Sequence, residues 1–111
     1  MMNHFLAEHF KKQLKPFLKK YRHLGDDLVS ALKIFDKRQA SPLGGNVYKL
    51  RLKTSDLPKG KSSSFRLIIF LLEHDDLIIP LAIYFKSERK SISLKEINEH
   101  LVMILAELRA G

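Results

Sequence analysis

Residues 65–86 read FRLIIFLLEHDDLIIPLAIYFK, and this stretch decides the fold class. Two apolar runs, 65–73 and 77–86, flank the acidic pair Asp75-Asp76. Short apolar runs that are rich in Ile and Phe and bounded by turn residues are typical of buried strands. Because the runs follow each other closely in the chain, we expect them to form neighbouring antiparallel strands joined by a turn at Asp75-Asp76.

A further strand is predicted upstream, at residues 47–53, where the side chains alternate in character. Tyr48, Leu50 and Leu52 fall on one face, and Lys49, Arg51 and Lys53 fall on the other. The composition of Pro42 to Asn46 predicts a loop before this strand, and residues 54–64 read as an exposed connection after it. The sequence therefore predicts an antiparallel sheet of three or four strands.

Helical spacing dominates the first third of the chain. A first apolar stripe comprises Phe10, Leu14, Phe17, Leu18 and Tyr21. Pro16 lies inside this stretch and predicts a kink or a split, because proline removes a helical hydrogen bond. After a turn at residues 23–25, a second stripe comprises Leu24, Leu28, Ala31, Leu32 and Phe35. We expect an N-terminal helical hairpin, preceded by a possible short strand at residues 5–7.

The C-terminal helix has the clearest start signal. Ser93 and Glu96 form a capping-box pattern, and an apolar stripe of Ile97, Leu101, Ile104, Leu105 and Leu108 follows. The predicted order of a helical hairpin, strands and a C-terminal helix indicates an α+β fold. We expect one domain, spanning residues 1–111.

The net charge and the composition restrict the classes of function and of partner that the sequence allows. The formal net charge is +8 and the pI is about 9.8, which favours a polyanionic partner such as nucleic acid, or an acidic protein. A basic protein with no nucleic-acid role is the alternative. The absence of cysteine excludes disulfides and thiolate chemistry. No apolar run of membrane-spanning length occurs, and the order of charge and apolar residues at the start differs from that of a signal peptide, so we expect a cytoplasmic protein with no membrane partner.

Signals for cofactors and metals are weak. Gly60-Lys61-Ser62 is similar to the end of a phosphate-binding loop, but Ser55 stands where that motif requires glycine. The five histidines lack metal-ligand spacing, and the acidic residues near Asp75 are ordinary turn residues. His100 is expected at the surface or in an interface. We predict neither a cofactor nor a metal site.

Cationic residues on the strands are the strongest candidates for chemistry. Arg66 is the only charge in its apolar run, and a buried charge is costly unless it is paired. It either reaches solvent or a carboxylate such as Glu88, or serves a site. A second basic cluster, Lys86, Arg89 and Lys90, follows Tyr84. If the strands are adjacent, one face offers fixed cations that stabilise the transition state of a phosphodiester.

These segments, in this order, resemble toxins of the RelE/HigB type from bacterial toxin–antitoxin pairs. The resemblance runs from about Phe5 to Leu108 and rests on VYKLRL (47–52), Gly60-Lys61, FRLI (65–68) and IYFKSER (83–89). It implies a microbial-RNase-like fold and metal-free cleavage of mRNA on the ribosome by attack of the RNA 2′-OH on the adjacent phosphate. The catalytic residues that it implies are Arg66, Arg51, Lys49 and Lys86. The implied RNA-binding residues are Lys53, Lys59, Lys61, Tyr84, Arg89 and Lys90.

The chain departs from the family pattern at two positions. Ser87 stands where RelE has an arginine, and Ser93 stands near the place of its C-terminal tyrosine. Tyr84 is a candidate substitute for that tyrosine. The implied partners are a cognate antitoxin, the ribosome with its mRNA, and operator DNA through the antitoxin. Two alternatives stay open: a catalytically weak member that binds operator DNA with its antitoxin, and a plain RNA-binding protein, for which stacking aromatics are sparse.

Overall fold

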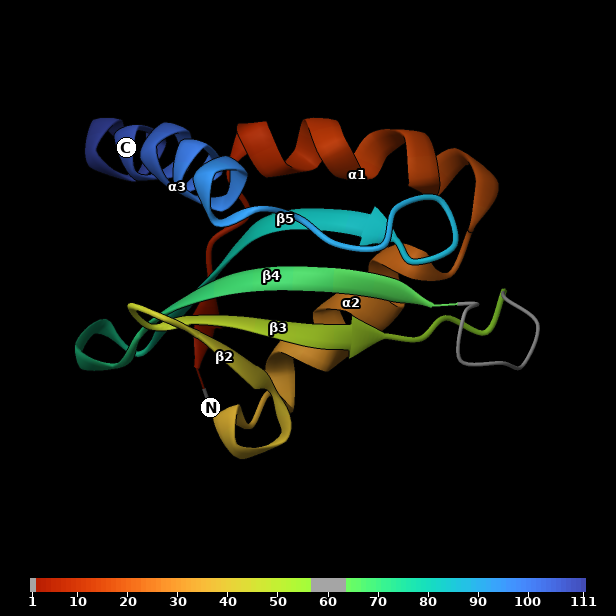
Figure 1. Ribbon diagram of the computed structural model, residues 1–111, viewed down its shortest axis with the longest axis horizontal. Coiled ribbons are helices and arrows are strands. Elements are labelled where there is room, and N and C mark those ends of the chain that lie inside the picture. The colour runs from red at the N-terminus through yellow and green to blue at the C-terminus, as the bar shows by residue number, and fades with distance from the viewer. Residues whose placement is uncertain (1, 57–63) are drawn as a thin grey trace.

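The computed structural model describes residues 2–56 and 64–111, and it confirms an α+β architecture (Figure 1). The strands are β1 (Asn3–His4), β2 (Ser41–Gly44), β3 (Val47–Leu52), β4 (Phe65–Leu72) and β5 (Leu77–Phe85). The helices are α1 (Glu8–Lys20), α2 (Leu24–Lys33) and α3 (Leu94–Ala110). Two short 3-10 turns, η1 (Lys37–Gln39) and η2 (Glu73–Asp75), complete the order.

The strands form one sheet in the order β1-β5-β4-β3-β2. The expected antiparallel meander of β3, β4 and β5 is confirmed. Within the described residues the sheet has five strands rather than the expected three or four, and it is mixed, because β1 pairs parallel with β5 while the other pairs are antiparallel. The turn expected at Asp75-Asp76 is present, and Asp76 takes a left-handed conformation with φ 52°.

The loop predicted at Pro42 to Asn46 was wrong in its first half, because β2 occupies Ser41–Gly44 there. This strand lies at the edge of the sheet, where a residue without a backbone N–H is tolerated. Its register with β3 shifts between Pro42 and Gly44. Gly44 has φ +95° and Asn46 has φ 66°, so glycine and asparagine supply the left-handed turn into β3.

The short first strand exists, but it lies at Asn3–His4 rather than at residues 5–7. It covers only the beginning of β5. Farther along the same edge, the Gln13 side chain of α1 donates to the Leu81 carbonyl at 2.9 Å and accepts from the Ile83 N–H at 3.4 Å. Helix α1 thereby continues the edge hydrogen bonding that β1 starts.

Helix α1 runs through Pro16 without the expected split. A proline inside a helix costs about 3 kcal/mol, and the burial of Phe10 and Leu14 on the apolar side of α1 offsets this cost. The turn between the helices lies at residues 22–23 rather than at the predicted 23–25, because α2 already begins at Leu24. The chain reverses after α1 and returns through α2 (Figure 1), and these two helices contact each other, as a helical hairpin requires.

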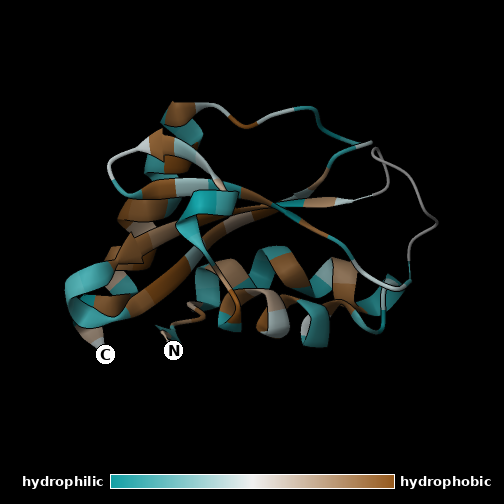
Figure 2. Cartoon of the chain, turned by 90° about the horizontal axis from the view of Figure 1, so that it is seen from below, coloured by the Kyte–Doolittle hydropathy of each residue, from teal (hydrophilic) through white to brown (hydrophobic). Residues whose placement is uncertain are grey.

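The core lies between the sheet and the helices, where the strands carry most of the hydrophobic residues (Figure 2). One sheet face packs on α1 and α2. There the Phe17 and Phe65 rings meet edge to face at 4.9 Å, and the Phe35 and Tyr48 rings lie 6.0 Å apart. Helix α3 buries Ile97 and Ile104. In the part of the chain that the structure describes, no helix is long and apolar enough to cross a membrane.

Candidate nucleic-acid interface

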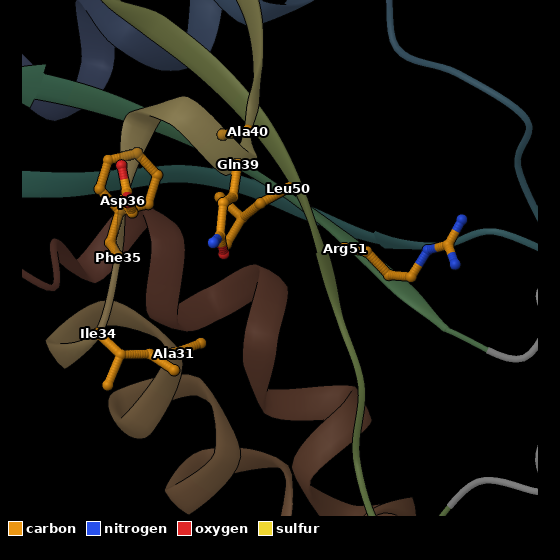
Figure 3. A pocket seen from close by; sticks show the side chains of 8 residues that line it. All are labelled: Ala31, Ile34, Phe35, Asp36, Gln39, Ala40, Leu50 and Arg51. Atoms are coloured by element: carbon orange, nitrogen blue, oxygen red, sulfur yellow. The ribbon is translucent and has the colours of Figure 1, made fainter.

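A row of three side chains that were predicted to be functional crosses the sheet. Arg51 of β3 is the register partner of Arg66 in β4, and Arg66 is the register partner of Tyr84 in β5. Register partners in neighbouring strands point to the same face of a sheet. We call Arg51, Arg66 and Tyr84 the cationic row. It lies on the face opposite the one that packs on α1 and α2, because Arg51 alternates along β3 with Tyr48, and the Tyr48 ring contacts Phe35 just after α2. In Figure 3 the Leu50 and Arg51 side chains, which both line the pocket beside α2, extend from β3 in different directions.

Arg66 is the buried cation of the row, with 9% of its surface exposed. Its Nη1 donates to the Ser64 Oγ at 2.6 Å and to the Phe65 carbonyl at 3.4 Å. No carboxylate within residues 2–56 and 64–111, Glu88 included, forms an ion pair with it. Burial lowers the pKa of Arg66, and the charge of Arg51 lowers it further. This positive charge is poorly solvated and stands beside a second one, so the position favours an anion.

Tyr84 closes the row on β5 and is 6% exposed. Burial raises the pKa of its phenol, while the charges of Arg66 and Arg89 act in the opposite direction. The phenol therefore keeps its proton at neutral pH. A protonated phenol beside Arg66 offers a hydrogen-bond donor to the same anion.

Arg89, predicted to bind RNA, is held by α3. Its guanidinium donates through both terminal nitrogens to the Glu96 carboxylate, one of them at 2.8 Å, and through Nε to the Ser91 carbonyl at 2.8 Å. It also lies 5.9 Å from the centre of the Tyr84 ring. A bidentate pair of this kind fixes geometry. Arg89 thus anchors the start of α3 beside Tyr84, and a phosphate has to compete with Glu96 for it.

The lysines are distributed around the cationic row. Lys49 is half-buried on the same face as Arg51, two residues earlier in β3. Lys53 and Lys90 are exposed beyond the ends of β3 and β5. The Lys86 Nζ lies 3.5 Å from the Lys90 carbonyl. Lys59 and Lys61, with the Gly60-Lys61-Ser62 motif, lie outside the described residues.

Sequence reasoning missed Ser64, which it assigned to an exposed connection. Ser64 is 1% exposed, and Thr54 at the other end of that connection is 7% exposed. The Ser64 carbonyl also accepts from the Lys86 N–H at 3.1 Å, which extends the β4–β5 ladder by one residue. The spacing of two residues between Ser64 and Arg66 was the available signal, because such residues share a face in a strand.

A second missed cluster joins α1 to α3. The His9 Nε2 lies 2.8 Å from the His100 Nδ1, so His100, expected at the surface or in an interface, is half-buried between α1 and α3. The Glu107 carboxylate accepts from the N–H groups of Glu8 at 2.7 Å and His9 at 2.9 Å, at the N-terminus of α1. These partners are more than 90 residues apart in sequence, and no local pattern connects them.

Within the described ranges, no group of three or more His, Asp or Glu side chains is arranged to hold a metal ion. The arrangement that the face does offer is cationic: two guanidinium groups and a phenol in one row, with Lys49 beside them. Fixed guanidinium groups match the geometry and the charge of a phosphate.

Comparisons with known proteins identify the family and the fold. The family model for the RelE toxin of the RelE/RelB toxin–antitoxin system matches residues 3–108. No curated protein matches the sequence. A solved structure of the E. coli toxin RelE, an arginine-to-alanine double mutant in the free state, superposes with a TM-score of 0.56 at 15% identity, covering 92% of this chain and 95% of that one. The expected RelE-like fold is therefore confirmed, and the chain belongs to the RelE toxin family.

Proposed function

We propose that this protein is the toxin of a type II toxin–antitoxin system and cleaves mRNA on the ribosome. The observation that carries the proposal is the cationic row, in which Arg66 is buried without a carboxylate partner among the described residues. Burying a charge in this way is costly unless a ligand or a reaction uses it. An RNA phosphate supplies the missing negative charge.

In the proposed reaction, the RNA 2′-oxygen attacks the adjacent phosphorus, and the bond from phosphorus to the 5′-oxygen breaks. The 2′-OH loses its proton, the 5′-oxygen gains one, and the products are a 2′,3′-cyclic phosphate and a 5′-OH. Arg66 stabilises the extra negative charge on the phosphoryl oxygens of the transition state. Lys49 and Arg51 bind the phosphate and assist proton transfer, and Lys86 supports the leaving side. No metal ion is needed, because these cations supply the charge.

RNA binding extends from this centre along the flanking basic residues. We assign it to Lys53, Lys59, Lys61, Tyr84, Arg89 and Lys90. Tyr84 takes the place of the family's C-terminal tyrosine, because its protonated phenol lies in register with Arg66. Arg89 contributes only when it exchanges Glu96 for phosphate.

The proposed partners follow from the charge of +8. A cognate antitoxin, which is a RelB in the family that matches, covers the cationic face with an acidic segment and neutralises the toxin. The ribosome presents the mRNA, and the antitoxin brings the complex to operator DNA. We place this single-domain protein in the cytoplasm, where the ribosome is.

Primer-extension mapping of a reporter mRNA in a reconstituted translation reaction tests the proposal. We expect wild type to cut at codon positions only when ribosomes are present, and Arg66→Ala to make no cuts. Arg109→Ala is the matched control, because Arg109 is an exposed arginine in the last turn of α3. Ribosome-independent cutting, or equal cutting by Arg66→Ala, contradicts the proposal.

A second candidate function is a catalytically weak member that binds operator DNA with its antitoxin. Two observations favour it. Ser87 is exposed and carries no charge, and the Ser93 Oγ is occupied as the cap of α3, accepting from the Glu96 N–H at 3.1 Å. Absence of cuts from folded wild type, together with an operator mobility shift that requires the antitoxin, supports this candidate instead.

A further inference from the structure

Ser64 lies immediately before β4, two residues from Arg66, the middle member of the cationic row. Its hydroxyl oxygen accepts the shortest hydrogen bond of Arg66, at 2.6 Å, and its side chain is on the face that Arg66 shares. Ser64 and Arg66 are two residues apart, so this contact is local and is set by the strand itself. We propose that Ser64 is a positioning residue that fixes the Arg66 guanidinium for the phosphate.

Arg66 needs such a support because its cross-strand neighbour carries the same charge. Arg51 lies directly opposite it in β3, and like charges at register partners repel each other. A flexible arginine turns away from such a neighbour. The bond to Ser64, with the weaker contact to the Phe65 carbonyl at 3.4 Å, holds the guanidinium in one orientation.

The kind of acceptor matters as much as its position. A carboxylate holds an arginine more strongly, as Glu96 holds Arg89, but it also cancels the charge and competes with phosphate. A hydroxyl orients one Nη group and leaves the positive charge uncompensated. Ser64 therefore gives Arg66 a fixed direction without reducing its attraction for an anion.

The backbone of Ser64 also contacts Lys86, a second candidate catalytic residue. Its carbonyl accepts from the Lys86 N–H at 3.1 Å, so one residue links Arg66 of β4 to the first residue after β5. The link to Arg66 runs through the side chain, whereas the link to Lys86 runs through the backbone. A substitution that removes the hydroxyl therefore disturbs Arg66 and keeps the ladder to Lys86.

This inference rests on the proposed function for its kinetic consequence. Ser64→Ala is expected to lower kcat by about 10- to 100-fold while KM stays within about three-fold, because orientation matters most in the transition state. Ser64→Thr keeps the hydroxyl and restores kcat. Thr54→Ala is the matched control: Thr54 is also buried, and its hydroxyl accepts from the Asp56 N–H at 3.5 Å. It leaves kcat unchanged.

An NMR measurement on the free protein tests the positioning role of Ser64 independently of the proposed mRNA cleavage. In ¹⁵N-arginine NMR spectra, wild type and Thr54→Ala show Arg66 Nη hydrogens with slowed exchange and restricted rotation, and Ser64→Ala loses both. A thermal unfolding scan of each variant establishes that it is folded. If wild type cuts no mRNA but Ser64→Ala still loses the slowed exchange and restricted rotation of Arg66, the proposed function fails and the positioning role stands. Unchanged Arg66 signals in folded Ser64→Ala overturn the positioning role.

Discussion

Arg51 and Arg66 are register partners in the antiparallel pair of β3 and β4, and both side chains point to the same face. Two guanidinium groups at opposed positions repel each other, and the partial burial of Arg66 weakens solvent screening of that repulsion. The folded protein therefore carries an electrostatic cost that anion binding relieves. Under the proposed function, the negative charge of an RNA phosphate offsets this cost.

Removing Arg51 is expected to stabilise the fold and to weaken activity. Arg51→Gln ends the repulsion and is expected to raise the free energy of unfolding by about 0.2–1 kcal/mol. Urea titration at low salt measures this change. Lys53→Gln is the control, since Lys53 lies beyond β3, and it is expected to change stability by less than Arg51→Gln. A less stable Arg51→Gln contradicts the repulsion.

Replacing Arg66 by lysine tests whether geometry matters beyond charge. Lysine keeps the charge but cannot donate a planar pair of hydrogen bonds to phosphate. We expect Arg66→Lys to lose at least about 100-fold in kcat, comparable to removing a donor from a preorganised site. Single-turnover cleavage on programmed ribosomes measures the loss. Near-wild-type cleavage by the lysine variant refutes the assigned role.

Ser93→Ala separates a structural serine from a catalytic one. The Ser93 hydroxyl caps α3, and loss of an N-cap typically costs about 1 kcal/mol of stability. We therefore expect a lower urea midpoint and unchanged kcat below the unfolding range. Ser87→Ala serves as its control, because Ser87 is exposed. A strong loss of kcat in folded Ser93→Ala would instead indicate a catalytic role for Ser93.

The contact between His9 and His100 predicts loss of stability in acid. Burial lowers the pKa of His9, and nearby His100 and Lys12 lower it further against the opposing Glu107. A histidine with a lowered folded-state pKa contributes stability above its unfolded pKa near 6.5, and this contribution is lost as pH falls through the folded value. The free energy of unfolding, measured at pH 7.5 and at about pH 5.5, shows how much stability is lost.

The matched comparison for this prediction uses glutamine variants. The free energy of unfolding of wild type, relative to that of His9→Gln, should decrease when the pH is lowered from 7.5 to about 5.5. His74→Gln, which changes an exposed histidine in η2, should show no such change relative to wild type. An equal pH response of wild type and His9→Gln shows that other groups cause the acid sensitivity.

Local patterns predicted the elements whose signals lie within a few residues. The Ser93 cap and the alternation of Leu50 with Arg51 are examples, since each depends on one helix turn or one strand. Strand β2 was missed because its Pro42 and Gly44 are acceptable only at a sheet edge, which sequence does not reveal. The side-chain contact of Arg89 with Glu96 depends on how the β5–α3 connection folds back. Burial of Ser64 likewise depends on tertiary packing.

The Gln13 side-chain amide also protects an edge of the sheet from pairing with other molecules. An exposed strand edge invites a strand from another molecule, and this is a common start of aggregation. Gln13 already occupies the Leu81 carbonyl and the Ile83 N–H, which an incoming strand would use. At the opposite margin, Pro42 lies within β2 and has no backbone N–H to donate. Both margins of the sheet thus discourage the toxin from polymerising with its own copies.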